Sequence, residues 1–170
     1  MKRISVLLLS AAALLCASCG YTIGGLTNGA MKDVKTFDVS MFENYTNYPY
    51  VAMQMTTALA DAMQADGTFR LVSPAKSDCC ISGKVVSVTP HSLITSPDDS
   101  YISTEIGLTV HVDYVVTDRK TGKELKKGSV RGQGSYFNTG GGNVQSAKES
   151  ALSYATRLAA REMVDALTLP

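Results

Sequence analysis

The chain has 170 residues, with 16 Lys and Arg against 15 Asp and Glu. This near-neutral balance excludes a polycationic nucleic-acid-binding surface. The length suits a single domain that can bury a hydrophobic core.

A secretory signal peptide is predicted at residues 1–18. Lys2 and Arg3 precede a small-apolar run from Ile4 to Ala17, which is too short to span a bilayer with margin. Cys19 follows small residues, which is typical of a bacterial lipoprotein signal, and acyl chains on Cys19 would anchor the chain to a membrane. The alternative is an ordinary signal peptide with a structural cysteine at position 19. Without the leader, 14 basic residues remain against 15 acidic ones.

Residues 19–33 are predicted to form a lipidated tether, and residues 34–170 to form one domain. The first predicted elements are a strand at 36–41, a polar aromatic connector at 42–48, a helix from Pro49 that Gly67 ends, and a short strand at 69–72. The apolar face of this helix carries Val51, Met55, Ala58, Leu59 and Ala62.

A second group of predicted strands follows. Residues 79–89 form a strand with a bulge, because the apolar phase shifts between Val85 and Val86. Residues 90–100 are predicted to be a loop, and residues 102–116 alternate clearly between apolar and polar side chains. A hairpin turn at 118–123, with Gly122 placed for a positive φ, leads to a strand at 125–137.

Glycines interrupt the last of these strands at Gly128, Gly132 and Gly134, which indicates a bend or the close approach of another backbone. The segment 146–149 is predicted as a capping box that opens the final helix. Small residues dominate the apolar stripe of that helix, so it can lie close to a sheet. The stripe consists of Ala151, Leu152, Ala155, Leu158, Ala159, Met163 and Ala166.

The order β-α-β-β-β-β-α predicts an α+β two-layer sandwich. Two amphipathic helices would cover one face of a mostly antiparallel sheet of four to five strands. The first strand is expected to pair in parallel with the strand that follows the first helix, through a right-handed crossover.

Motifs for catalysis, metal binding or cofactor binding are absent from the sequence. His111 is predicted on the polar face of a long strand near Glu105 and Asp113, where alternation places polar residues in any sheet. The sequence therefore predicts no enzyme, no metal site and no cofactor. Cys79 and Cys80 are expected to begin a strand, one facing in and one facing out; a disulfide or a redox role is the alternative.

Five basic residues cluster at the predicted hairpin. They are Arg119, Lys120, Lys123, Lys126 and Lys127. They form either a solvated turn or a site for the phosphate of a lipid headgroup. The glycine-rich segment 139–142 could hold an anion at the start of the last helix, although a plain loop is the more common case.

Several segments in order together resemble the lipopolysaccharide-assembly lipoprotein family, LptE. They are 19–21 with Gly25, 42–46 after a strand, Pro49 with 56–59, 69–72, 77–78 before 81–85, and 149–152. The family usually has Ala-Asp where this chain has Ser77-Asp78. The resemblance spans nearly the whole chain after the leader.

The resemblance implies a plug inside an outer-membrane β-barrel, an LptD-like protein, whose assembly the family assists. It also implies lipopolysaccharide binding, to which basic side chains contribute in the family. The segments 91–101 and 138–147 contain no Lys or Arg, so the resemblance does not place the binding residues there. By resemblance to lipoprotein-sorting rules, Gly20 favours the outer membrane, with the domain facing the periplasm and the barrel lumen. The alternatives are a cell-wall synthase activator, a curli-type secretion-channel component and a secreted enzyme, the last of which the missing catalytic motifs disfavour.

Overall fold

The computed structural model describes residues 31–95, 103–138 and 143–168. Their elements, in chain order, are β1 (Thr36–Val39), β2 (Glu43–Asn44), α2 (Val51–Asp66), β3 (Arg70–Leu71), the 3-10 helix η2 (Pro74–Lys76), β4 (Cys79–Thr95), β5 (Ser103–Asp118), β6 (Glu124–Phe137) and α3 (Val144–Thr168).

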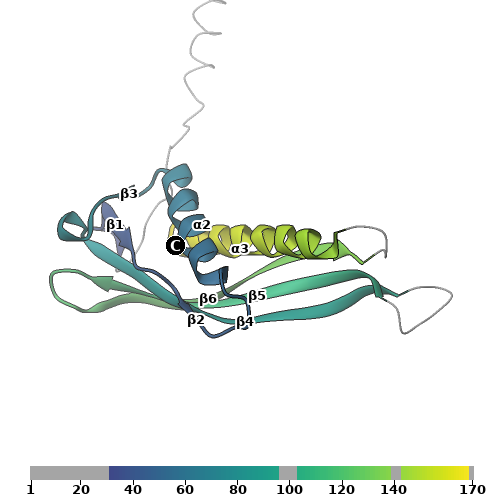
Figure 1. The fold of residues 1–170 in the computed structure, drawn as a ribbon. Coiled ribbons are helices and arrows are strands. Elements are labelled where there is room, and N and C mark those ends of the chain that lie inside the picture. The colour runs from purple at the N-terminus through teal and green to yellow at the C-terminus, as the bar shows by residue number, and fades with distance from the viewer. Residues whose placement is uncertain (1–30, 96–102, 139–142, 169–170) are drawn as a thin grey trace, which may run out of the picture.

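The strands form one mixed sheet in the order β3-β1-β4-β5-β6, with β2 also paired to β4. The three long strands are antiparallel, whereas β1 pairs in parallel with both β3 and β4. Both helices cover the same face of this sheet (Figure 1). The α+β class and the parallel pairing of β1 with β3 are thus confirmed. The sheet has six strands rather than four to five, because β2 lies within the segment predicted to be a connector.

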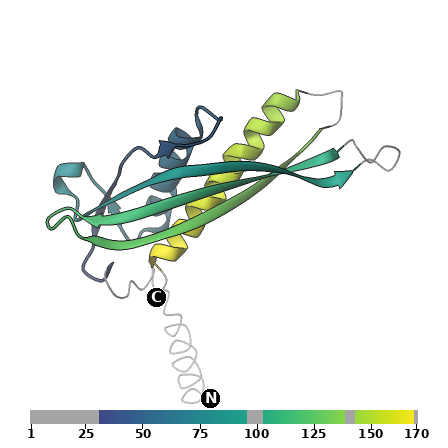
Figure 2. The same ribbon diagram turned by 90° about the horizontal axis from the view of Figure 1, so that it is seen from below.

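The long strands twist together and extend past the end of the helix layer (Figure 2). The predicted bulge is confirmed, since the register of β4 against β5 shifts between Val85 and Ser87. The predicted loop at 90–100 is wrong for residues 90–95, because β4 continues through Pro90, opposite Leu108, to Thr95. Residues 96–100 lie outside the described residues. Proline is tolerated at a sheet edge, and β1 and β2 pair only with the first part of β4, up to Val85.

α3 lies unusually close to β6. A Cβ built on Gly132 would stand 1.9 Å from the carbonyl oxygen of Ala155, and one on Gly134 would stand 2.3 Å from that of Ala151. Both contacts are with the helix backbone, and the small stripe of α3 is what allows them. The prediction of a close backbone approach is therefore confirmed at these two glycines.

α3 begins earlier than the predicted capping box. The side-chain oxygen of Asn143 accepts a hydrogen bond from the backbone N–H of Ser146, at 3.2 Å, and the helix starts at Val144. Ser146 is consequently inside the first turn, and Glu149 accepts a hydrogen bond from Gln145 instead of reaching back to a cap. Asn is as good an N-cap residue as Ser, so the sequence was compatible with a helix start at either Asn143 or Ser146.

The core lies between the sheet and the two helices. Side chains that alternate along β5, as predicted, pack on their buried face against α3, whereas α2 packs against β1, β3, β4 and α3. The largest of the completely buried side chains are Phe37, Met31, Met55, Leu59, Met63, Ile81, Leu108, Met163 and Leu167. Among the described residues, neither helix is apolar and long enough to cross a membrane.

Candidate binding surfaces

The β5–β6 hairpin is organised by Asp118. One of its carboxylate oxygens accepts hydrogen bonds from the backbone N–H groups of Lys120 (2.9 Å) and Thr121 (2.7 Å) and from the Thr121 hydroxyl (2.9 Å). These hydrogen bonds lower the pKa of Asp118, and the bond from the Thr121 N–H has the largest effect. Gly122 has a φ of 69°, as predicted for the turn.

Arg119 turns away from the hairpin tip and binds Asp38 on β1. Its Nε and Nη2 donate to the two carboxylate oxygens at 3.0 and 2.6 Å, and the Ser77 hydroxyl donates to the first of these at 2.5 Å. Asp38 is only 3% exposed. Burial raises the pKa of Asp38, but the hydrogen bonds from Arg119 and Ser77 and the charge of Arg119 outweigh it, so that its pKa is lowered overall.

The remaining basic residues of the hairpin have different surroundings. Lys126 donates to the carbonyl oxygen of Ala166 in the last turn of α3, and Lys127 forms an ion pair with Glu124 at 3.2 Å. Lys120 and Lys123 are exposed at the tip. The five predicted residues therefore do not form one site, because Arg119 and Lys126 support the fold.

Cys79 and Cys80 begin β4 as free thiols, one buried and one half-buried, which confirms the predicted strand start. Burial, and then the neighbouring carboxylate of Asp78, raise the pKa of Cys79 to about 12. A thiol with so high a pKa is a poor nucleophile at neutral pH. The sulfur of Cys80 lies 3.1 Å from the hydroxyl of Ser40.

His111 lies on the sheet face opposite the helices, between Ser87 on β4 and Arg131 on β6. The two acids predicted near it have other partners. Glu105 accepts from the Ser135 hydroxyl at 2.7 Å, and Asp113 pairs with Lys84 at 3.7 Å. Over residues 31–95, 103–138 and 143–168, no group of three His, Cys, Asp or Glu side chains could hold a metal ion.

A groove between α2 and α3 was not predicted from the sequence. Three hollows, of about 440, 310 and 190 Å³, follow one another. On one side they run from Tyr48, just before α2, to Ala65 on α2, and on the other from Gln145 to Arg161 along α3. Neighbouring hollows share Met53, Gln54 and Arg157 among their lining residues. The only sequence signal was the pair Arg157 and Arg161, which the helical period places one turn apart outside the apolar stripe.

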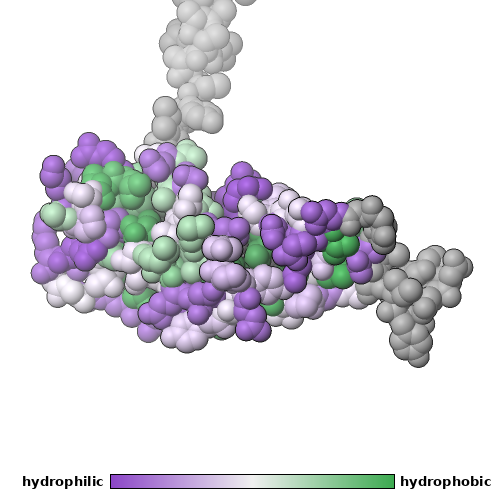
Figure 3. Space-filling view, in the orientation of Figure 1, coloured by the Kyte–Doolittle hydropathy of each residue, from purple (hydrophilic) through white to green (hydrophobic). Residues whose placement is uncertain are grey.

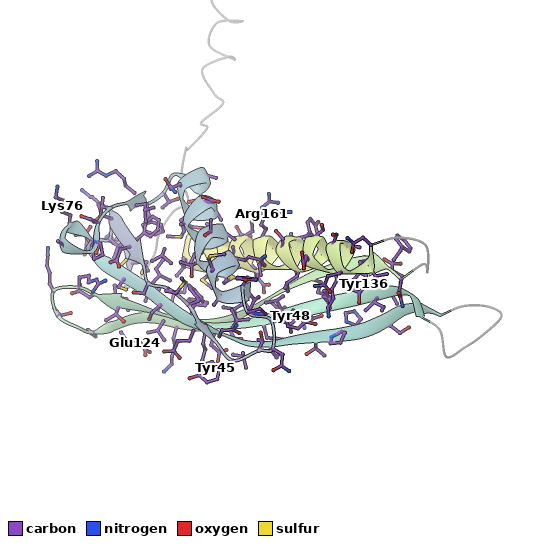
Figure 4. The ribbon with its side chains drawn as sticks, viewed as in Figure 1. Tyr45, Tyr48, Lys76, Glu124, Tyr136 and Arg161 are labelled. Carbon is purple, nitrogen blue, oxygen red and sulfur yellow. The ribbon has the colours of Figure 1, made fainter. Side chains whose placement is uncertain are left out.

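Large apolar side chains are exposed on the connector between β1 and α2. Met41, Tyr45 and Tyr50 are 65%, 66% and 68% exposed. Tyr45 lies on the sheet face opposite the helices, and Tyr48 lies closer to α3 (Figure 4). The ammonium of Lys148 on α3 stands over the Tyr48 ring, 4.9 Å from its centroid.

The predicted sites at Cys19 and at 139–142 lie outside the described residues. The family model described as LptE, lipopolysaccharide-assembly, matches residues 34–167, from just before β1 to the last turn of α3. The chain belongs to the LptE family. No curated protein matches the chain by sequence.

Solved structures share the fold of this LptE-family chain at low sequence identity. A lipoprotein B from Nitrosomonas europaea has a TM-score of 0.56 at 13% identity, over 79% of this chain and 83% of that one. A putative lipoprotein from Caulobacter crescentus has a TM-score of 0.54 at 14% identity, over 78% and 87%. The PelC dodecamer from Paraburkholderia phytofirmans has a TM-score of 0.50 at 15% identity, over 85% and 95%. At these identities, the likeness shows the fold alone.

Proposed function

We propose that this LptE-family chain is a non-enzymatic outer-membrane lipoprotein that plugs and helps to assemble an LptD-like β-barrel and binds lipopolysaccharide. The family match over residues 34–167 carries the proposal, because it includes every strand that the structure describes, all of α2 and nearly all of α3. The acids near His111 have other partners, which supports a role without catalysis.

Exposed aromatic and methionine side chains support a protein partner. Tyr and Met are enriched in protein interfaces, and the connector exposes Met41, Tyr45 and Tyr50. Acyl chains on Cys19 would hold this surface at the membrane.

Lys120 and Lys123 are the residues we propose for contact with lipopolysaccharide phosphate. Both are exposed at the hairpin tip, where an ammonium can approach a phosphate as a point charge. Lys127 lies next to them but forms an ion pair with Glu124. Arg119 and Lys126 already donate hydrogen bonds within the fold, so they are less available to a phosphate.

A mild-detergent pull-down of the tagged full chain from outer membranes tests the proposed function. We expect a stoichiometric β-barrel and lipopolysaccharide to co-purify, and Lys120→Gln combined with Lys123→Gln to lower the lipopolysaccharide recovered but not the barrel. Recovery of a cell-wall synthase would favour the activator alternative. Rings of the protein alone would favour the secretion-channel alternative.

Cys19→Ala is expected to move the protein from the membrane fraction to the soluble fraction, because two or three acyl chains anchor far more firmly than any other feature of the tether. Fractionation of cell envelopes measures this. Circular dichroism of the variant should match that of the domain produced without the leader, since Cys19 lies outside residues 34–167. A variant that stays with the membrane would contradict lipidation at Cys19.

A further inference from the structure

The groove between α2 and α3 combines a wide aromatic end with a narrow end of small residues. Tyr48, Tyr50 and Met53 line the wide end, together with Leu152 from α3. Ala58, Ala62 and Ala65 line the narrow end. White and green surface lies where α2 meets α3, with purple polar patches beside it (Figure 3). The groove is therefore mainly apolar along its length.

Two guanidinium groups stand at the narrow end without a carboxylate partner. Arg157 and Arg161 both line it, and neither forms an ion pair with any residue that the structure describes. Asp61 is the one acid that lines the same hollow. Arg161 projects from α3 on the side where the C-terminal part of α2 stands (Figure 4). Arg157 Nη1 donates to the Ser153 hydroxyl at 3.3 Å, and this partner carries no charge. The narrow end thus carries more positive than negative charge, which can pair with an anionic group.

A buried acceptor lies between the two ends. Gln54 lines both the wide hollow and the middle one. Its Oε1 atom is buried and has no hydrogen-bond donor among the described residues. An unmet acceptor of this kind costs free energy, and a ligand N–H would remove that cost after a small rotation of the side chain.

We propose that this groove binds an acidic peptide segment of a protein partner. Carboxylates of the segment pair with Arg157 and Arg161, a backbone N–H donates to Gln54 Oε1, and an apolar side chain fills the wide end. Tyr, Met and Arg are the residue types enriched at protein interfaces, and all three line this groove. The groove proposal shares one assumption with the proposed function, namely that this chain has a protein partner.

Other occupants fit the groove less well. Residues 20–30 of this chain contain no Asp or Glu, so this part of the tether offers no carboxylate to the two arginines. The acyl chain of a phosphorylated lipid would fill the apolar floor and its phosphate would meet the arginines. However, an acyl chain has no donor for Gln54 Oε1, whereas a peptide backbone has one at nearly every residue.

Selection of short random peptides displayed on phage, against the full-length protein, tests the proposal without needing the barrel. We expect the selected peptides to carry Asp or Glu next to Leu or Phe. Binding of one such peptide, measured by fluorescence polarisation, should weaken by about tenfold or more in a variant with Arg157→Gln and Arg161→Gln, because interfacial charge pairs are lost. The matched control combines Lys32→Gln with Lys76→Gln, since both lysines are exposed and lie outside the groove. This control should change binding by less than about twofold.

Gln54→Met gives a readout that simple damage to the fold cannot imitate. The substitution removes the unmet acceptor and keeps the shape of the side chain, so thermal stability should be unchanged or higher. Peptide binding should nevertheless weaken by about fivefold.

Three results would overturn the proposal: selected peptides without acidic residues, acidic peptides that bind the double arginine variant equally well, or no selected peptide at all. Arginine-dependent binding to phosphatidylglycerol vesicles without peptide binding would assign the groove to a lipid instead. Recovery of the barrel in the pull-down together with any of these results would leave the proposed function standing. If acidic peptides bind the groove but the barrel is not recovered, the groove proposal stands and the proposed function fails.

Discussion

Replacing Gly132 by alanine is expected to destabilise the protein by about 3 kcal/mol or more. The new Cβ would lie 1.9 Å from the carbonyl oxygen of Ala155 and 2.6 Å from the backbone nitrogen of Ala159. These atoms belong to the backbone of α3 and cannot rotate away. The helix would have to move off β6, which would open the core that Ala155, Ala159 and Met163 close.

Urea denaturation of the domain produced without the leader measures this effect, with circular dichroism as the signal. Gly107→Ala is the matched control, because it places the same methyl group on the adjacent strand. There the nearest atoms belong to the imidazole of His91, an exposed side chain that can rotate aside. The control should lose much less stability. Equal losses in the two variants would show that the glycine backbone matters rather than the approach of α3.

Asp38→Asn is expected to lower stability at neutral pH by about 2 kcal/mol, because a buried carboxylate loses its charge-assisted hydrogen bonds to Arg119 and Ser77. The pair joins β1 to the start of the β5–β6 hairpin, 81 residues away. Its loss should therefore loosen the edge of the sheet, where β1 and β3 are short.

The pH dependence of stability gives the sharper test. The pKa of Asp38 is lowered in the folded protein from a value of 3.8. A lowered pKa adds stability that is present above the unfolded value and is lost as the pH falls through the folded value. The stability difference between the wild type and Asp38→Asn should thus be constant down to about pH 5 and shrink in more acidic solution.

Denaturant titrations across that pH range measure the difference. Asp78 and Asp118 also have lowered pKa values, so both proteins lose stability in acid, and only the difference between them reports on Asp38. Asp113→Asn is a suitable control. Its ion pair with Lys84 is 3.7 Å long and about half exposed on both sides, so its removal should matter little. A difference that does not depend on pH would contradict an ionised, stabilising Asp38.

The periodicity of the sequence was sufficient to predict the helices, β5, β6 and the layer arrangement, but only the first part of β4, because Pro90 indicated the start of a loop. The stripe of small residues in α3 and the glycines of β6 predicted a close helix–sheet contact, which the structure confirms at Gly132 and Gly134. The bulge near Val85 and the positive φ of Gly122 were also predicted correctly. These features follow from local rules of dihedral preference and side-chain alternation.

The order of segments along the chain was also enough to identify the family, because the LptE model matches residues 34–167. Which of the hairpin charges have partners, in contrast, depends on how the elements pack. Arg119 looked like a ligand-binding residue in a basic cluster, yet its partner Asp38 lies on β1. The groove between α2 and α3 likewise exists only once the helices pack. Such contacts join residues far apart in the chain, and alternation within a strand or helix gives no information about which distant charge a side chain will meet.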